Sequence, residues 1–236
     1  MNNATAHLAE SPIDINSLKK TVLSRASLVL IFMGMILFLP AGTLAYWQAW
    51  VWLAVWFIPA SFLIAHYLRT DPALIERRIR MKEKEHAQKR IMSAAFVLFI
   101  VAFLIPGFDR RYGWSFVPIP VVLIADCFIL AGYLFFIRVL KENRYASRTI
   151  EVVPGQHVVT TGPYAVVRHP MYVAALAIYL SSPLALGSFC SLPVCALFIP
   201  ILVARIRNEE EVLVQKLDGY VEYMRNTPYR LIPGIW

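Results

Sequence analysis

The sequence predicts an all-α integral membrane protein with about six transmembrane helices. Apolar residues make up 58% of the 236 residues and charged residues only 16%, a composition typical of membrane proteins rather than of soluble domains. Several apolar runs are long enough to cross a hydrocarbon core of about 30 Å as helices. The 23 Lys and Arg residues also cluster between alternate apolar runs, which allows an orientation to be predicted.

Four apolar runs have the length of a single membrane-spanning helix. They cover Ala26–Ala45, Trp47–Leu68, Ile91–Phe108 and Phe116–Ile137. The first run ends in AGTLA, which also has the form of a signal-peptide cleavage site. We favour a retained helix, because the segment before it is long for a signal peptide and its removal would reverse the orientation of every later span.

A fifth apolar stretch, Tyr172–Ala204, is too long for one untilted span. SSPLALGS, residues 181–188, supplies the Pro and Gly of a turn in its middle, so we predict that the last two spans form a short helical hairpin. Six spans place 21 of the 23 Lys and Arg residues on one side of the membrane, and only Arg110 and Arg111 on the other. Because positive residues concentrate on the cytoplasmic side, both termini are predicted to be cytoplasmic.

The segment between the fourth span and the hairpin, residues 143–172, ends in GPYAVVRHPMY. It is too apolar and aromatic to be disordered, and long segments of this kind usually carry function. Pro170 disfavours helix at the preceding residue and suits the first turn of the next helix. Tyr164, Arg168 and His169 therefore lie at the membrane boundary, beside a helix N-terminus that can hold a carboxylate or the polar edge of a ligand. Alternatively, Arg168 and Tyr172 only anchor the interface.

A second motif, RIRNEEEVLVQKLDGYVEY, follows the hairpin at residues 205–223. Apolar residues recur at helical spacing from Leu213 to Met224, which predicts one cytoplasmic C-terminal amphipathic helix that stops before Pro228. Three acids, Glu209–Glu211, lie where the chain leaves the membrane. Alone they indicate a solvated helix, but opposite the RHP motif they indicate a polar site.

Together the two motifs resemble the isoprenylcysteine carboxyl methyltransferases and the related phospholipid methyltransferases. The first ends in the family's RHPxY, and the second is similar to its R-x-x-x-E-E…G-x-x-Y-x-x-Y block; the resemblance covers residues 143–236. It implies a membrane methyltransferase that binds S-adenosylmethionine in its cytoplasmic half and takes a lipophilic acceptor from the bilayer. The residues that it assigns to the donor are Gln156, His157, Val158, Val159, Tyr164, His169, Pro170, Met171, Tyr172 and Glu210.

Methyl transfer from a sulfonium requires alignment of the reactants and exclusion of water, and no metal. The acceptor is expected to be either the carboxylate of a prenylcysteine-like molecule or the amine of a phospholipid-like molecule. A carboxylate would need a nearby cation, and an amine would need an acid to accept its proton. The candidate catalytic residues are the cations Arg168, Arg205 and Arg207 and the acid Glu209, with Glu211 as an alternative acid.

One position departs from the isoprenylcysteine branch, because Ile206 stands where that branch has an arginine four residues before the donor-contacting glutamate. This weakens prenylcysteine as the acceptor. Membrane sterol or steroid reductases are a rival class, but three acids and no Gly-rich loop are a poor match to the phosphates of a nicotinamide cofactor. A transporter is a second rival, since Asp126 lies inside a span. No inverted repeat accompanies it, and we expect Asp126 to bond to a neighbouring helix or to face the substrate cavity.

We expect one membrane-embedded domain, residues 1–236, with N-terminal helices in 1–140 and the cofactor-binding region in 141–236. Its expected partners are a lipophilic small molecule and membrane lipids. Basic residues flank apolar spans instead of forming an aromatic-laced basic surface, so no nucleic-acid partner is expected. His157 and His169 lack a carboxylate at helical spacing, so we predict no metal site.

Overall fold

The computed structural model describes residues 14–80, 86–143, 145, 152 and 155–236. These residues form helices and no strands, so the all-α prediction is confirmed. The helices in chain order are α1 (Ile15–Ala41), α2 (Trp47–Thr70), α3 (Pro72–Arg80), α4 (His86–Tyr112), α5 (Ile119–Glu142), the 3₁₀ turn η1 (Gly162–Ala165), α6 (Pro170–Ala185), α7 (Leu192–Ala196), α8 (Phe198–Lys216) and α9 (Tyr220–Asn226).

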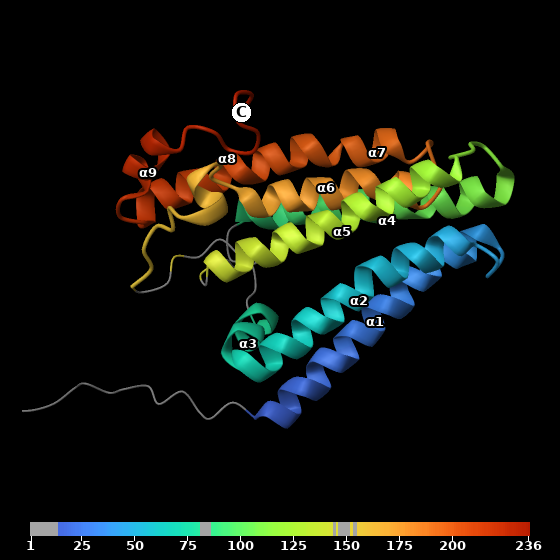
Figure 1. Cartoon of the computed structure of the whole chain (residues 1–236), viewed down its shortest axis with the longest axis horizontal. Helices are drawn as coiled ribbons and strands as arrows, with labels where there is room; N and C mark the ends of the chain where they lie inside the picture. The colour runs from blue at the N-terminus through green and yellow to red at the C-terminus, as the bar shows by residue number, and fades with distance from the viewer. Residues whose placement is uncertain (1–13, 81–85, 144, 146–151, 153–154) are drawn as a thin grey trace, which may run out of the picture.

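Four of these helices, α1, α2, α4 and α5, are long and apolar enough to cross a membrane, and α6 is a shorter apolar helix. In Figure 1 the short connections α1–α2, α4–α5 and α6–α7 gather at one end of the bundle, while α3 and α9 lie at the other, called here the α9 end. Helix α5 packs mainly on α6, α1 on α4, and α8 on α4. The chain is therefore an integral membrane helical bundle.

The predicted hairpin is present, but its second limb differs from the prediction. Helix α6 leads to the turn at residues 186–191, and the chain returns through α7 and the first part of α8. Helix α8 then continues without a break to Lys216. The six predicted spans thus correspond to four full-length helices and this hairpin, and the acidic residues lie on the same helix as its returning limb.

The prediction of a single C-terminal amphipathic helix, with Glu209–Glu211 on its first turns and apolar residues from Leu213 to Met224, is wrong. Helix α8 ends at Lys216, Leu217 has an extended conformation, and Gly219 has φ 81°, which is left-handed backbone that favours glycine. The separate helix α9 stops before Pro228, as expected. The apolar spacing continues across the break between α8 and α9 because residues on both sides, Leu217 and Tyr220 among them, are buried in the same cluster.

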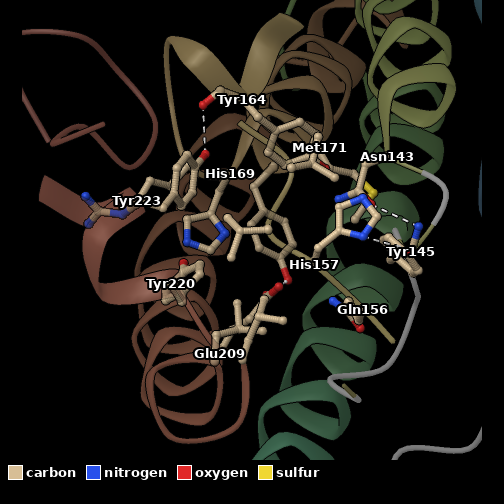
Figure 2. A pocket seen from close by; sticks show the side chains of 16 residues that line it. Asn143, Tyr145, Gln156, His157, Tyr164, His169, Met171, Glu209, Tyr220 and Tyr223 are labelled. Atoms are coloured by element: carbon tan, nitrogen blue, oxygen red, sulfur yellow. Dashed lines mark hydrogen bonds between the residues drawn. The ribbon is translucent and has the colours of Figure 1, made fainter. Parts of the chain in front are cut away.

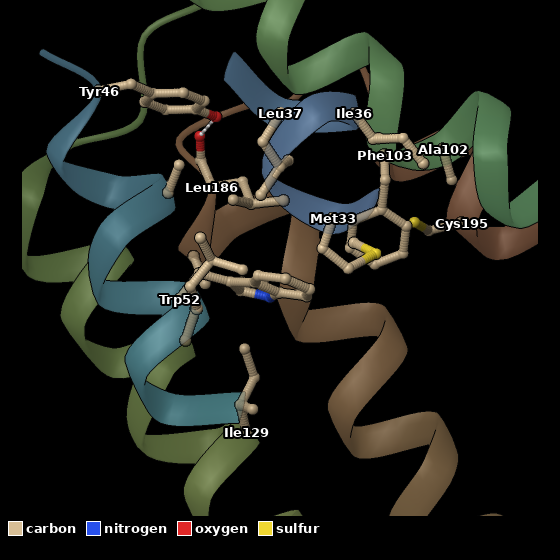
Figure 3. Close-up of a cluster of buried hydrophobic side chains, with 14 of the residues drawn as sticks. Met33, Ile36, Leu37, Tyr46, Trp52, Ala102, Phe103, Ile129, Leu186 and Cys195 are labelled. Atoms are coloured by element: carbon tan, nitrogen blue, oxygen red, sulfur yellow. Dashed lines mark hydrogen bonds between the residues drawn. The ribbon is translucent and has the colours of Figure 1, made fainter. Parts of the chain in front are cut away.

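The core of the bundle is built on large side chains from several helices, as Figure 3 shows. Trp52, Phe103 and Ile129 are at most 1% exposed, and the Trp52 indole donates to Ser182 Oγ at 3.0 Å, which joins α2 to α6. Helices α5 and α6 approach closely at Gly132, where a Cβ would lie 2.8 Å from Ile178 Cγ1. This contact sets the position of α6, whose first residues border the site.

A second, smaller cluster occupies the α9 end. Its buried members are Val139, Tyr164, Leu217, Tyr220 and Tyr223. Three valines of the segment before α6 pack against it, at positions 152, 158 and 159. The prediction that the segment 143–172 packs is therefore confirmed for its described residues; residues 144, 146–151 and 153–154 lie outside the described part.

Candidate active site

A polar cavity lies at the α9 end, between the segment that leads into α6, the last turns of α8, and α9 (Figure 2). It encloses about 100 Å³. Its walls combine aromatic, aliphatic and ionisable side chains. The lining residues are Asn143, Tyr145, Gln156, His157, Val158, Val159, Tyr164, Arg168, His169, Met171, Tyr172, Glu209, Leu213, Leu217, Tyr220 and Tyr223.

The segment before α6 is held in place by a turn and by α9. Gly162 has φ 58° and starts the 3₁₀ turn η1, a conformation that glycine adopts without strain. Tyr164 is buried, and its carbonyl accepts a hydrogen bond of 2.8 Å from the Tyr223 hydroxyl. Pro170 is the first residue of α6, as predicted, so His169 lies directly before the helix and faces the cavity.

Glu210 is the centre of a buried ionic cluster next to the cavity. Its Oε1 lies 2.7 Å from Arg168 Nε and 3.1 Å from His169 Nε2, and its Oε2 lies 2.7 Å from Arg230 Nε. Burial alone would raise the pKa of Glu210, but the hydrogen bonds from His169, Arg168 and Arg230 outweigh it and lower the pKa to about 2. The ionised carboxylate only accepts hydrogen bonds, so His169 Nε2 carries a proton in this contact.

Arg168 is a structural part of this cluster. The residue is 6% exposed, and besides Glu210 its guanidinium donates to the carbonyls of Thr227 and Pro228, each at 2.8 Å. The alternative that Arg168 is an interfacial anchor is therefore wrong, because its charge faces the protein interior.

A chain of hydrogen bonds crosses the wall of the cavity at Tyr172. Its hydroxyl accepts from Arg205 Nε at 2.8 Å and donates to Glu209 Oε2 at 2.5 Å. Glu209 lines the polar cavity, whereas Arg205 lines a second cavity on the other side of the tyrosine. Tyr172 therefore links a cation and an acid that belong to different cavities.

The second cavity is an apolar groove of about 620 Å³. Helices α1, α4, α6 and α8 form its walls, and it shares Met171 and Tyr172 with the polar cavity. The lining residues are Val29, Phe32, Met33, Ile91, Met92, Ala95, Phe96, Phe99, Met171, Tyr172, Ala175, Leu176, Tyr179, Phe198, Ile201, Leu202 and Arg205. The groove suits the hydrocarbon part of an amphiphile whose polar end lies near Arg205.

The structure brings most of the sequence-predicted site residues into the polar cavity. Those that line it are Gln156, His157, Val158, Val159, Tyr164, Arg168, His169, Met171, Tyr172 and Glu209. Four others have different positions. Arg205 lines the groove, Pro170 starts α6, Glu210 is buried in the ionic cluster, and Arg207 is exposed on α8.

Sequence reasoning missed several residues at this site. Tyr145 lies in the wall and its hydroxyl is 3.2 Å from His157 Nδ1. Leu213, Leu217 and Tyr220 line the cavity, although their helical spacing indicated only an apolar helix face. Arg230 gave no signal, because it lies 20 residues beyond Glu210 and no motif includes it.

Asp126 meets neither sequence-based expectation. It is 6% exposed, yet neither carboxylate oxygen has a hydrogen-bond partner within the described part of the chain. It lines neither the polar cavity nor the apolar groove. The same described residues contain no group of three or more His, Cys, Asp or Glu side chains that could hold a metal ion.

The known proteins that resemble this chain include a sterol reductase and a Ras methyltransferase. Delta(14)-sterol reductase TM7SF2 of Mus musculus is 32% identical over 91 residues, which are 37% of this chain; the match spans only 22% of that relative's length. The solved structure of the eukaryotic intramembrane Ras methyltransferase ICMT is 16% identical, with a TM-score of 0.43 over 95% of this chain and 88% of that one.

The match to a sequence family is more informative about the site. Residues 122–215 match the family model of the isoprenylcysteine carboxyl methyltransferases. This range includes the RHP motif, the hairpin and the three acids of α8, so it contains most of the residues around the polar cavity. Through this region, about two fifths of its length, the chain is similar to the isoprenylcysteine carboxyl methyltransferase (ICMT) family.

Proposed function

We propose that the protein transfers a methyl group from S-adenosylmethionine to a lipophilic acceptor. The observation that carries the proposal is that a polar cavity and an apolar groove meet at Met171 and Tyr172. A polar cofactor and a hydrocarbon tail can thereby occupy separate spaces while their reacting ends meet. Alignment of this kind is the main contribution that an enzyme makes to such a transfer.

The residues of the polar cavity suit this donor. When bound, S-adenosylmethionine supplies an electrophilic methyl group on a sulfonium. Leu217 and Tyr220 offer apolar and aromatic surface, Gln156 and His157 offer hydrogen-bonding groups, and Glu209 offers a negative charge to a cationic ligand. The cavity volume of about 100 Å³ is smaller than the roughly 300–1,000 Å³ of ligand pockets. We therefore propose that binding of S-adenosylmethionine includes a rearrangement of the lining side chains.

The acceptor is proposed to lie in the apolar groove with its reacting group at Tyr172. Of the three candidate arginines, Arg205 lines the groove, Arg168 is engaged by Glu210, and Arg207 is exposed. An acceptor carboxylate would be oriented by Arg205, and an acceptor amine would pass its proton to Glu209. Methyl transfer in mixed micelles to a prenylcysteine-like acid and to an aminophospholipid distinguishes these two cases.

We also propose that the α9 end is cytoplasmic, with both termini on that side, and that residues 1–236 form one membrane domain. Support for the orientation comes from the sequence, because 21 of the 23 Lys and Arg residues lie in segments assigned to this side. Labelling of single cysteines introduced at Arg225 and at Arg110 with a membrane-impermeant reagent tests it. Labelling of Arg110→Cys, but not Arg225→Cys, from the cytoplasmic side would contradict it.

Calorimetry of the detergent-solubilised protein with S-adenosylmethionine tests the donor assignment. We expect binding by the wild type, a loss of about tenfold or more in His169→Ala, and a similar loss in Glu210→Ala, since Glu210 orients that imidazole. His66→Ala is a matched control, because His66 is exposed and lies outside the polar cavity. Equal affinity in all four proteins would remove the site assignment.

A sterol-type reductase is the second candidate function, favoured by the match to Delta(14)-sterol reductase TM7SF2. Three acids on α8 would repel the phosphates of such a cofactor. The repulsion is weaker than the sequence indicates, because the charge of Glu210 is neutralised by ion pairs with Arg168 and Arg230. Titration with a reduced nicotinamide cofactor in the same calorimeter separates the candidates. Binding of that cofactor without binding of S-adenosylmethionine would favour the reductase.

A further inference from the structure

The C-terminal segment, residues 227–236, is docked on the RHP motif. The backbone N–H groups of Arg168 and His169 donate to the carbonyls of Tyr229 and Arg230, at 2.9 and 3.0 Å. The segment also closes on itself, since the Trp236 carbonyl accepts from the N–H groups of residues 230, 231 and 232. The backbone of His169 is therefore held by a segment that follows the last helix.

Arg230 extends this docking to the side chains. Its Nε donates to Glu210 Oε2 at 2.7 Å, and its guanidinium carbon lies 5.2 Å from the centre of the Trp236 ring. The side chain is 29% exposed, against 5% for that of Glu210. Trp236 and the folded segment thus present Arg230 to one oxygen of the buried carboxylate.

The two oxygens of Glu210 have different partners, and this difference orients His169. Oε2 is bound by Arg230, which leaves Oε1 for Arg168 Nε and His169 Nε2. The terminal torsion of a glutamate is soft, and an arginine readily binds both oxygens of one carboxylate. Without Arg230, the Glu210 carboxylate is free to rotate toward Arg168 and away from the imidazole.

We propose that Arg230 is a positioning residue of the donor site, which acts through Glu210 to hold the His169 imidazole in one orientation and one tautomer. The inference rests on the proposed function, because His169 lines the cavity assigned to the donor. Among the described residues, the other ionisable groups around this carboxylate are Glu209 on α8 and the hydroxyls of Tyr220 and Tyr223 on α9. None of them replaces the hydrogen bond that Arg230 donates to Oε2.

Calorimetry with S-adenosylmethionine is the first test. Arg230→Ala is expected to weaken binding about tenfold, the loss of one hydrogen bond to a charged group. Arg230→Lys keeps the charge and should recover part of the affinity. Arg225→Ala is the matched control, because Arg225 is exposed on α9 and makes no ion pair within the described residues. In a Glu210→Gln background, Arg230→Ala should cost little more, since both act through one carboxylate.

The state of His169 is the second test, and it requires no ligand. In ¹⁵N-histidine-labelled protein, with the signal assigned by its loss in His169→Gln, we expect the tautomer protonated at Nε2. Arg230→Ala should shift that signal toward a mixture of tautomers, whereas Arg225→Ala should not. If Arg230→Ala does not fold, Arg230→Gln replaces it in both tests.

The two tests separate the inference from the proposed function. If the wild type does not bind S-adenosylmethionine but the tautomer of His169 depends on Arg230, the proposed function is wrong and the positioning role of Arg230 stands. An unchanged His169 signal in the Arg230 variant, or an affinity equal to that of Arg225→Ala, would overturn the positioning role.

Discussion

Replacement of Glu210 by Gln removes the charge at the centre of the buried cluster while it keeps the size of the side chain. The folded protein holds the pKa of Glu210 near 2, against a usual value of 4.5. At about 1.36 kcal/mol per pKa unit, this carboxylate contributes about 3 kcal/mol to the free energy of unfolding at neutral pH. That agrees with the roughly 3–5 kcal/mol lost when one partner of a buried ion pair is removed.

The pH dependence of this effect follows from the direction of the shift. Because the pKa is lowered on folding, the contribution is fully present above pH 4.5 and is lost as the pH falls toward 2. Chemical unfolding in detergent should therefore show Glu210→Gln about 3 kcal/mol less stable than the wild type at pH 7, with the difference shrinking below pH 4.5. Glu211→Gln, an exposed neighbour, should stay within about 0.5 kcal/mol. Equal losses in both variants, or a difference independent of pH, would refute the reasoning.

Three further predictions concern helix packing, the buried carboxyl of Asp126 and the junction of the cavities. Gly132→Ala should lower the free energy of unfolding by about 1–3 kcal/mol, because the added Cβ would clash with Ile178. Gly34→Ala is the control, since a Cβ there has no neighbour within 4 Å. Equal losses of stability in the two variants would contradict the close approach of α5 and α6. Asp126→Leu should leave the melting temperature unchanged or raise it, because burial of an unsatisfied carboxyl costs about 1–3 kcal/mol; a clear decrease would indicate a partner. Tyr172→Phe should slow methyl transfer about tenfold, because it removes both hydrogen bonds of the hydroxyl. The ring that lines the polar cavity is kept, so the calorimetric affinity for S-adenosylmethionine should change less than the rate. A fall in affinity without a fall in rate would contradict the role of Tyr172 at the junction.

The sequence predicted the helical membrane fold because hydrophobicity and the length of a span are local properties. It also predicted that Pro170 starts a helix, since proline restricts its own backbone and that of the residue before it. It failed at residues 213–224, where one apolar spacing runs through two helices. Hydrophobic periodicity reports which residues are buried, and the chain buried the same face on both sides of the turn at Gly219.

For the site, the family resemblance carried by the two motifs implied most of the residues that line the polar cavity. Only the folded chain decided which charges meet. In the sequence, three acids lie together and three arginines lie nearby. In the folded chain Glu210 is buried and Arg207 is exposed. Arg230, from the C-terminal segment, forms an ion pair with Glu210. Ion pairs of this kind depend on side-chain direction and on the closure of distant segments, and neither follows from local spacing.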